Sequence, residues 1–268
     1  MIKDITLGQY FPLDSPIHRI DPRFKIVFTL IYIILIFFAN SILTYTLVAS
    51  FILMVILLSK VKVLVVLKSV KSLMFVIIIT AIINVFFTGG SDILWEYKFI
   101  KITYQGVYNA VNMALRLIFL VMGSSLLTYT TSPISLTDGI EKLLKPFSKI
   151  GLPSHEIAMM MTIALRFIPT LLEETEKIMT AQKSRGADFE SGGLIKRAKA
   201  LIPVLIPLFI NSFKRADELA TAMECRCYRG GDGRTRLRVL KLQKLDYISL
   251  AIVIIFGTAL ITMNIYSI

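Results

Sequence analysis

Two short segments of the sequence end alike and place an arginine among small residues. Residues 180–186 read TAQKSRG and residues 221–227 read TAMECRC, so in both an arginine follows four positions after a Thr-Ala pair. These arginines, Arg185 and Arg226, are 41 residues apart. A guanidinium presents forked donors to carboxylates or helix-end carbonyls, and small neighbours let another protein approach closely. Each arginine alone could simply favour its own helix end, but two matching ends predict two similar receptors.

No motif typical of an enzyme occurs in the sequence. The phosphate-binding GxxxxGK[ST], the zinc-protease HExxH and the nucleophile motif GxSxG are all absent. The only histidines, His18 and His155, are far apart in the chain. Cys225 and Cys227 form one C-x-C without a second ligand pair, which argues against a zinc site and indicates small residues in a reducing compartment. We therefore expect a non-catalytic chain without a cofactor or a metal.

One further polar set lies within an apolar segment, residues 107–128. Asn109, Asn112 and Arg116 are spaced three and four apart, which places them on one helical face. An arginine inside a membrane usually faces protein or water and suggests a function. Alternatively, the helix starts later and Arg116 lies at its interfacial end. The polar face is the basis of one alternative function, a membrane-embedded enzyme.

The composition indicates a membrane protein. Hydrophobic residues make up 55% and charged residues 18%, against roughly 45–50% and 25% in soluble domains. Uncharged runs of 34 and 20 residues occupy 26–59 and 72–91, and no charged residue follows Asp246. Apolar runs of this length are candidate membrane spans. An ordinary soluble globule, a disordered chain and a disulfide-stapled domain are therefore excluded.

The uncharged runs predict five transmembrane helices. Treated as one helix, the first run would be about 50 Å long, beyond the hydrocarbon core of about 30 Å, so two spans with a turn at residues 40–41 fit better. The five predicted spans are 26–39, 42–58, 73–87, 107–128 and 247–266. Residues 93–104, rich in β-forming residues, predict either a short external hairpin or a plain loop.

Charge is concentrated in one block, residues 129–245. It holds 19 of the 30 Lys and Arg residues and 12 of the 18 acidic residues, a net charge of +7. Positive charge marks the cytoplasmic side of a membrane protein, so we expect the N-terminus and this block in the cytoplasm and the C-terminus outside the cell membrane. A nucleic-acid site would need stacking aromatics and few acidic residues, so no nucleic-acid partner is predicted.

The charged block contains two long amphipathic segments, preceded by a shorter one over residues 136–150. The apolar stripe of the first long segment consists of Ile157, Met161, Ala164, Ile168, Leu171 and Ile178. The stripe of the second consists of Ala198, Ile202, Leu205, Phe209, Phe213, Ala216, Ala220 and Met223. We expect these stripes to be buried against the membrane or a partner, with packing between the two helices as the alternative. Methionines suit surfaces that repack against varied partners.

The predicted fold is an all-α integral membrane protein with about five transmembrane helices and a cytoplasmic block of amphipathic coupling helices. The predicted domains are a four-span N-terminal domain (1–128), the coupling helices (129–245) and a C-terminal transmembrane helix (246–268). The lipid bilayer is thus one predicted partner.

Several motifs together resemble one family, the transmembrane coupling subunit (T component) of energy-coupling factor transporters. These transporters are importers of vitamins and micronutrients in the ATP-binding-cassette class. The resemblance covers almost the whole chain. It rests on SPIHRIDP (15–22), TSP (131–133), ALRFIP (164–169), AQKSRGAD (181–188), RADELA (215–220) and ECRCY (224–228).

The resemblance implies how the arginines act. The family signature is a pair of Ala-Arg-Gly-like tripeptides at the tips of two crossing coupling helices, and each tip inserts into a groove on one of two ATPase subunits. The matching residues here are Ser184, Arg185 and Gly186, and Cys225, Arg226 and Cys227. The second tripeptide departs from the pattern at both flanks, where cysteine is still a small residue.

The resemblance also implies a membrane-embedded substrate-capture protein, the S component, held by apolar surfaces of the coupling helices. The residues assigned to this surface are Met161, Ile168, Leu171, Phe209 and Phe213. ATP hydrolysis and the substrate site would then lie on partner chains. The pattern looks most like the shared type that serves several capture proteins, although cobalt- and nickel-dedicated relatives are similar. An ordinary permease would need polar residues in several spans, and only one span has them.

Overall fold

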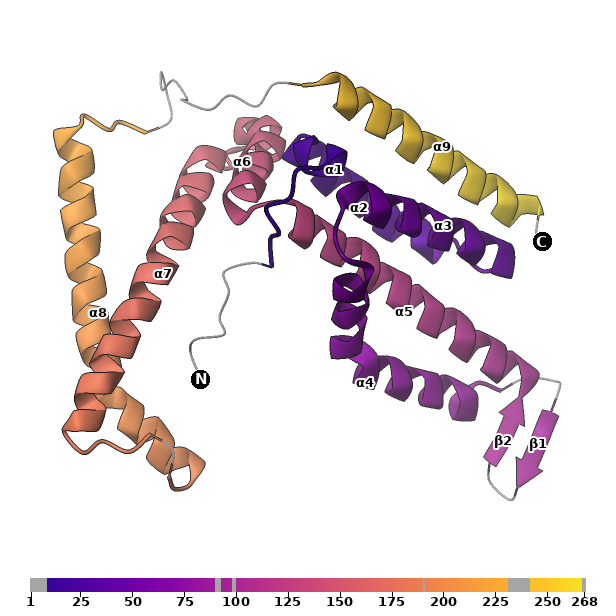
Figure 1. The fold of residues 1–268 in the computed structure, drawn as a ribbon, viewed down its shortest axis with the longest axis horizontal. Coiled ribbons are helices and arrows are strands. Elements are labelled where there is room, and N and C mark those ends of the chain that lie inside the picture. Colours follow the sequence, from indigo (N-terminus) through magenta and orange to yellow (C-terminus); the bar gives the residue numbers. More distant parts are fainter. Residues whose placement is uncertain (1–8, 90–92, 98–99, 190, 231–241, 267–268) are drawn as a thin grey trace. The chain divides into compact units, whose positions relative to one another are not determined.

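The computed structural model is almost entirely helical, with one short hairpin (Figure 1). It describes residues 9–89, 93–97, 100–189, 191–230 and 242–266. The chain divides into two compact units. Among the described residues, the helix-bundle unit runs to Gly139 and resumes after residue 241, and the α7–α8 unit lies between Ile140 and Gly230. The predicted all-α fold is confirmed.

The helix-bundle unit is organised around α5. Its helices are α1 (Pro16–Arg19), α2 (Pro22–Phe37), α3 (Ile42–Ser59), α4 (Val63–Phe87), α5 (Tyr104–Thr130) and α9 (Lys244–Tyr266). Helix α5 packs against α2, α3 and α4, and α9 packs against α2 and α3. The rings of Phe51 and Phe256 stack with their centroids 4.1 Å apart. The core includes Tyr32, Ile36, Val48, Ile52, Ile56, Val66, Leu126, Tyr129, Phe256 and Leu260.

Local capping chemistry sets the first helix boundaries. The Asp21 carboxylate accepts the N–H of Arg23 at 2.9 Å, and Pro22 occupies the first helical position, where its missing N–H costs nothing. Between α2 and α3 the Thr44 hydroxyl accepts the N–H of Ser41 at 3.1 Å, as in a capping box. The predicted turn at residues 40–41 is therefore present.

Within the described residues, five helices are long and apolar enough to cross a membrane: α3, α4, α5, α7 and α9. Five spans were expected, but the set differs. Helix α2, with 16 residues, is about 24 Å long, shorter than a hydrocarbon core of about 30 Å. Among these candidate spans, α7 has the lowest mean hydropathy, 1.3 against 1.8 to 2.4 for the others. The assignment of α2 rather than α7 to the membrane stays a prediction.

Two helices begin before the spans that were expected in them. The third span was expected to begin at residue 73, but α4 begins ten residues earlier, at Val63. Lys68 and Lys71 lie on the exposed surface of this helix, where long side chains can extend their ammonium groups away from apolar surroundings. Helix α5 begins at Tyr104 because the Thr103 hydroxyl accepts the N–H of Gly106 at 3.1 Å and caps it.

The segment between α4 and α5 forms the hairpin that was one of two alternatives. Strand β1 (Ile93–Tyr97) pairs antiparallel with β2 (Ile100–Thr103). In this register Trp95 lies opposite Ile102 and Glu96 opposite Lys101. The hairpin prediction is confirmed for the described residues, and the plain loop is excluded.

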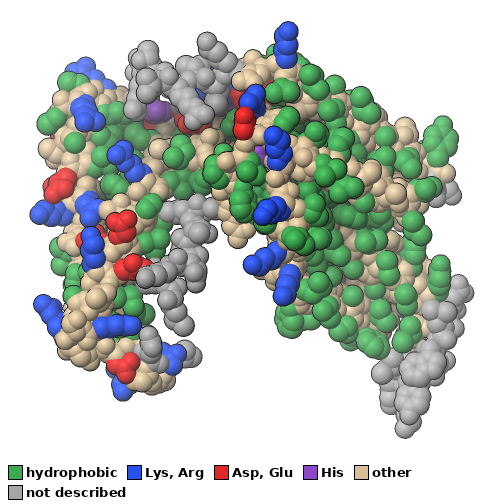
Figure 2. Space-filling view, in the orientation of Figure 1, with side chains coloured by type: hydrophobic (Ala, Val, Ile, Leu, Met, Phe, Trp, Pro, Cys, Tyr) green, Lys and Arg blue, Asp and Glu red, His purple; other side chains and the backbone are tan. Residues whose placement is uncertain are grey.

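The α7–α8 unit contains the rest of α6 (Pro133–Leu144), in which the unit boundary falls, then a 3-10 helix (Lys145–Ile150), α7 (Ser154–Ser184) and α8 (Leu194–Cys225). The two long helices have 31 and 32 residues, so each is about 47 Å long. Charged side chains gather over α7 and α8, whereas hydrophobic side chains cover the visible face of the bundle helices (Figure 2).

Candidate functional site

Helices α7 and α8 cross as an antiparallel pair (Figure 1). Midway along the pair, the Glu174 carboxylate of α7 accepts the Asn211 amide N–H and lies 3.0 Å from Nη2 of Arg215. The two partners are four residues apart, so α8 presents both from one face. Met159 of α7 and Met223 of α8 line one pocket. The end of α8 therefore lies beside the beginning of α7.

Helix α7 ends in a Schellman motif, in which the two residues after the last helical turn bond back to helix carbonyls. The N–H of Ala187 donates to the carbonyl of Gln182 and that of Gly186 to Lys183, both at 3.0 Å. Gly186 has a φ of +87°, a left-handed conformation that favours glycine. Arg185 is the C-cap residue of α7. Local backbone geometry therefore places its side chain at the helix tip.

Helix α8 ends in the same motif. The N–H of Tyr228 donates to the carbonyl of Met223 at 3.0 Å and that of Cys227 to Glu224 at 2.8 Å. Arg226 is the C-cap residue, and Cys227 has a φ of +55° at the position that Gly186 occupies in α7. The similarity seen in the sequence is thus a similarity of backbone structure. It also explains why a glycine suits this position.

All six residues of the two tripeptides are exposed. Arg226 lines the same pocket as Met159, and Arg185 lies 26 positions after Met159 along α7. The two arginines are therefore about 40 Å apart along the pair. Among the described residues, no carboxylate lies within ion-pair distance of either guanidinium. The pair therefore presents two equivalent basic tips at its opposite ends.

The apolar residues assigned to a partner surface differ in exposure. Met161, Ile168 and Leu171 of α7 are half-buried, whereas Phe209 and Phe213 of α8 are 62% and 69% exposed. The two phenylalanine rings lie side by side, with centroids 6.2 Å apart. The same helix exposes Ile202, Leu205, Ile206 and Ile210. Packing between α7 and α8 thus leaves most of the α8 stripe uncovered.

Arg116 holds the turn between α2 and α3. Its Nη2 donates to the carbonyl of Ala39 at 3.3 Å and to Oδ1 of Asn40 at 3.0 Å. Its guanidinium carbon lies 5.6 Å from the centroid of the Phe37 ring, a cation–π contact. Because α5 begins at Tyr104, twelve residues earlier, the alternative in which the helix starts later and Arg116 lies at its end is wrong. The side chain faces protein.

The other two members of the polar face are half-buried on the same helix. The backbone carbonyl of Asn112 accepts the Tyr45 hydroxyl at 3.1 Å. Within the part of the chain that the structure describes, no side-chain hydrogen bond joins Asn109 or Asn112 to Arg116. The spacing of the three residues therefore reflects helix packing, and the structure does not bring them together as a reaction centre.

The described residues also include no group of three or more His, Cys, Asp or Glu placed to hold a metal ion.

Comparison with known proteins assigns the family. The family described as "Cobalt transport protein" matches residues 14–237. A protein from Clostridium kluyveri named energy-coupling factor transporter transmembrane protein EcfT is 60% identical over 250 residues, 93% of each chain. Proteins of the same name from Acidaminococcus fermentans and Ruminiclostridium cellulolyticum are 58% and 53% identical, over 92% and 98% of this chain and 91% and 98% of their own. The chain belongs to the EcfT family.

Membership of the EcfT family confirms the resemblance inferred from the motifs. The chain is therefore a transmembrane component of an energy-coupling factor transporter. The matched region, residues 14–237, includes both arginine tips. The names of these relatives state no cargo, whereas the description of the matching family names cobalt.

Sequence reasoning missed a polar junction at the end of α5 in this EcfT-family chain. The N–H of Phe11 donates to the carbonyl of Tyr129 at 3.1 Å. The Lys25 ammonium donates to the carbonyls of Thr130 at 2.8 Å and His18 at 3.2 Å. The last carbonyls of a helix have no donor within it, and a cation near them is favoured by the helix dipole. The N-terminal segment therefore caps α5.

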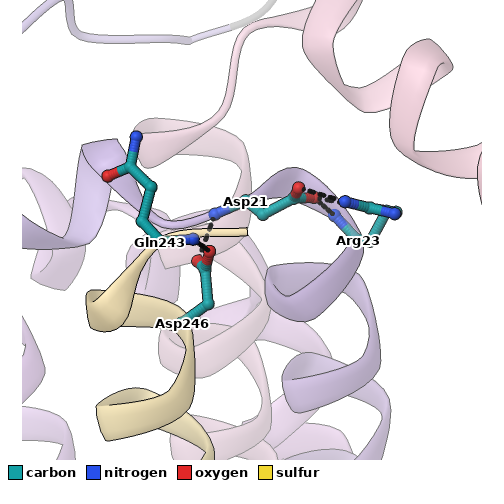
Figure 3. Close-up of polar contacts among 4 residues, drawn as sticks. All are labelled: Asp21, Arg23, Gln243 and Asp246. Atoms are coloured by element: carbon teal, nitrogen blue, oxygen red, sulfur yellow. Dashed lines mark hydrogen bonds and ion pairs between the residues drawn. The ribbon is translucent and has the colours of Figure 1, made fainter. Parts of the chain in front are cut away.

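A second missed contact joins the two ends of the helix-bundle unit (Figure 3). Asp246 is 1% exposed, and its carboxylate accepts the N–H of Asp21 at 2.8 Å and that of Gln243 at 2.7 Å. Burial alone would raise the pKa of Asp21, but its hydrogen bonds from Arg23 hold that pKa below the ordinary value. Asp21 therefore stays ionised at neutral pH. Asp21 before Pro22 is a readable helix-start signal, but nothing in the sequence pairs it with Asp246.

Proposed function

We propose that this chain couples two ATPase subunits to a membrane-embedded substrate-capture protein during vitamin or micronutrient uptake. The observation that carries the proposal is the pair of equivalent arginine tips at opposite ends of the α7–α8 pair. A separation of about 40 Å suits two receptors on two subunits better than one groove. The names of the relatives, which are transporter transmembrane proteins, support the same role.

The uncovered apolar stripe of α8 supports a capture-protein contact. Large exposed apolar surfaces of a protein commonly mark interaction sites, and aromatic side chains are enriched at binding hot spots. Phe209 and Phe213 are the largest exposed side chains of this stripe. ATP hydrolysis and substrate recognition would lie on the partner chains. A dedicated cobalt or nickel role is the second candidate, favoured by the description of the matching family.

Purification of the tagged chain from its own cells tests the assembly. We expect two ATP-binding-cassette ATPases and at least one small membrane protein to be recovered with it. Several different capture proteins would indicate the shared type, whereas one protein that carries a metal would indicate the dedicated type. Recovery of the chain without ATPases, together with activity of the isolated chain on a substrate, would favour a membrane enzyme instead.

We also propose an orientation in which the N-terminus and residues 129–245 are cytoplasmic and the C-terminus is outside. The concentration of Lys and Arg in that block supports it. Lys3, a further positive charge near the N-terminus, lies outside the described residues.

The two free, exposed cysteines make the orientation measurable. In cells that make the chain without ATPases, a membrane-impermeant maleimide should label Cys225 and Cys227 in inverted vesicles and leave them unlabelled in intact cells. Co-expressed ATPases should protect both thiols, because the tip would be covered. Labelling of intact cells would overturn the orientation.

The control uses a chain whose two cysteines are replaced by serine and that carries Gly89→Cys. Gly89 is exposed, and a side chain added there meets no atom within 4 Å. This single thiol lies at the opposite end of α4 from its N-cap residue Lys62. The proposed orientation places Lys62 in the cytoplasm, so the thiol should be labelled in intact cells.

A further inference from the structure

The helix-bundle unit contains an apolar cavity of about 180 Å³ between α2, α3, α5 and α9. Aliphatic and aromatic side chains form most of its wall, and Lys25 is the one charged residue among the described residues that line it. The cavity reaches the surface, since its lining residues Met54, Leu58 and Ile252 are 38%, 44% and 37% exposed. An apolar guest could therefore enter from the surroundings of the helices.

The depth of the cavity matches one leaflet of a bilayer. Its lining runs on α2 from Lys25 to Leu35, on α5 from Thr130 back to Gly123 and on α9 from Ser249 onward to Phe256. At 1.5 Å per residue these stretches are about 10–15 Å long, and half of a hydrocarbon core is about 15 Å. Lys25, Thr29, Thr130 and Ser249 lie toward the end at which α2 and α9 begin, and Tyr32 lies deeper.

The wall offers water few partners. The hydroxyls of Thr29, Tyr32, Thr130 and Ser249 all donate to backbone carbonyls, of Lys25, Phe119, Leu126 and Asp246. A buried water needs two to four polar partners, and apolar cavities of roughly 150 Å³ stay dry and accept apolar guests. A hydrocarbon chain therefore fits this space better than water does.

Lys25 supplies a charge at the polar end. Its side chain is 7% exposed, and its ammonium uses two of three N–H donors, on the carbonyls of Thr130 and His18. No carboxylate of the described residues lies within ion-pair distance of it. An acceptor with negative charge at this end would complete its hydrogen bonding.

We propose that this cavity binds one acyl chain of an anionic membrane phospholipid, with the headgroup phosphate beside Lys25. A partner helix, about 10 Å across, is too wide for a cavity of 180 Å³. A lipid chain has the right width, the right length for one leaflet and a phosphate at the required end. The proposal needs only the membrane location of the chain and is independent of the coupling role.

Photo-crosslinking of the full-length chain in lipid vesicles tests the proposal. The vesicles consist of phosphatidylcholine with a small share of phosphatidylglycerol whose acyl chain carries a terminal diazirine. After irradiation, mass spectrometry should find adducts concentrated near Leu35 and Phe256, the deep end of the cavity. Unlabelled phosphatidylglycerol should compete about fivefold better than phosphatidylcholine, the effect expected of one cationic group near a membrane surface.

Two matched variants on α9 separate the cavity from the outer surface. Val253 lines the cavity, and its neighbour Ile254 does not and is 56% exposed. Val253→Trp should remove most of the cavity adducts, and Ile254→Trp should leave them unchanged. Lys25→Met should abolish the preference for phosphatidylglycerol, which Lys25→Arg should retain.

Three results would overturn the proposal. Cavity adducts that survive Val253→Trp would show that the guest does not occupy this space. Adducts spread evenly over the exposed helix surfaces would identify only general lipid contact. Equal competition by both phospholipids would exclude the anionic headgroup. Because Lys25 also caps α5, the Val253 and Ile254 pair decides the matter if Lys25→Met does not fold.

Discussion

A chain that carries both Arg185→Ala and Arg226→Ala is expected to lose its ATPase partners almost completely while it still inserts into the membrane. Each arginine is exposed at a helix tip, where docking would desolvate and pair the guanidinium, as at binding hot spots. Truncating one partner of such a pair costs about 2–5 kcal/mol, a roughly 30- to several-thousand-fold loss of affinity. Pull-down of the ATPases, normalised to membrane-inserted chain, measures this loss.

Either single alanine substitution should weaken assembly less than the double substitution. The remaining tip holds the ATPase pair at a high effective concentration, so the second contact is partly retained. Substitution by Glu should be worse than by Ala at either position, because repulsion adds to the lost pairing. Normal assembly and uptake by the double alanine variant would show that Arg185 and Arg226 only cap their helices.

Two controls separate the arginine from its surroundings. Lys214→Ala removes an exposed basic side chain from the middle of α8 and should leave ATPase recovery unchanged. Cys227→Gly keeps Arg226 and relieves the left-handed backbone at φ +55°, which disfavours residues with a side chain by about 1–2 kcal/mol. Assembly should equal or exceed that of the unaltered chain. A loss instead would mean that the Cys227 side chain itself contacts the ATPase.

Phe209→Glu should reduce recovery of the capture protein before it reduces recovery of the ATPases. Phe209 is 62% exposed and its ring lies beside that of Phe213. Removing this ring should therefore cost the isolated chain little folding stability. Burying such a side chain against a partner contributes about 1.5–3 kcal/mol, so its loss alone lowers affinity at least about tenfold. A buried carboxylate adds to the cost. The ratio of capture protein to ATPase in co-purification measures the effect, and Met161→Glu should act in the same direction.

Two further substitutions make the capture-protein result interpretable. Lys214→Glu brings a carboxylate to an exposed position five residues from Phe209 and also removes a positive charge. It should still leave both recoveries unchanged. Val204 is 2% exposed, so Val204→Glu buries an unpaired charge and should unfold the chain. Equal loss of both partners from the Phe209 variant, or a globally unfolded chain, would contradict a dedicated capture-protein surface.

The hydropathy of the sequence predicted where the helices occur more accurately than where they begin and end. The turn at residues 40–41 was found because one helix of 34 residues would exceed the membrane. The expected span leaves out the first ten residues of α4 because Lys68 and Lys71 look like loop residues in a hydropathy window, although both fit the exposed face of a helix. A hydropathy window averages over all faces of a helix, so it does not distinguish a charge on the exposed face from a charge in a loop.

The sequence by itself determined the family, the helical membrane fold and the matching arginine tips. These depend on residues within a few positions of one another, since hydropathy, helix propensity and a Schellman motif are local properties. Tertiary structure alone decided that Asp246 accepts the N–H of Asp21, 225 residues away, and that Arg116 binds the α2–α3 turn. It also decided that the Phe209 ring is left uncovered. Hydrogen bonds and packing between distant segments depend on which helices come into contact in the folded chain. Such contacts have no local or periodic signature in a single sequence.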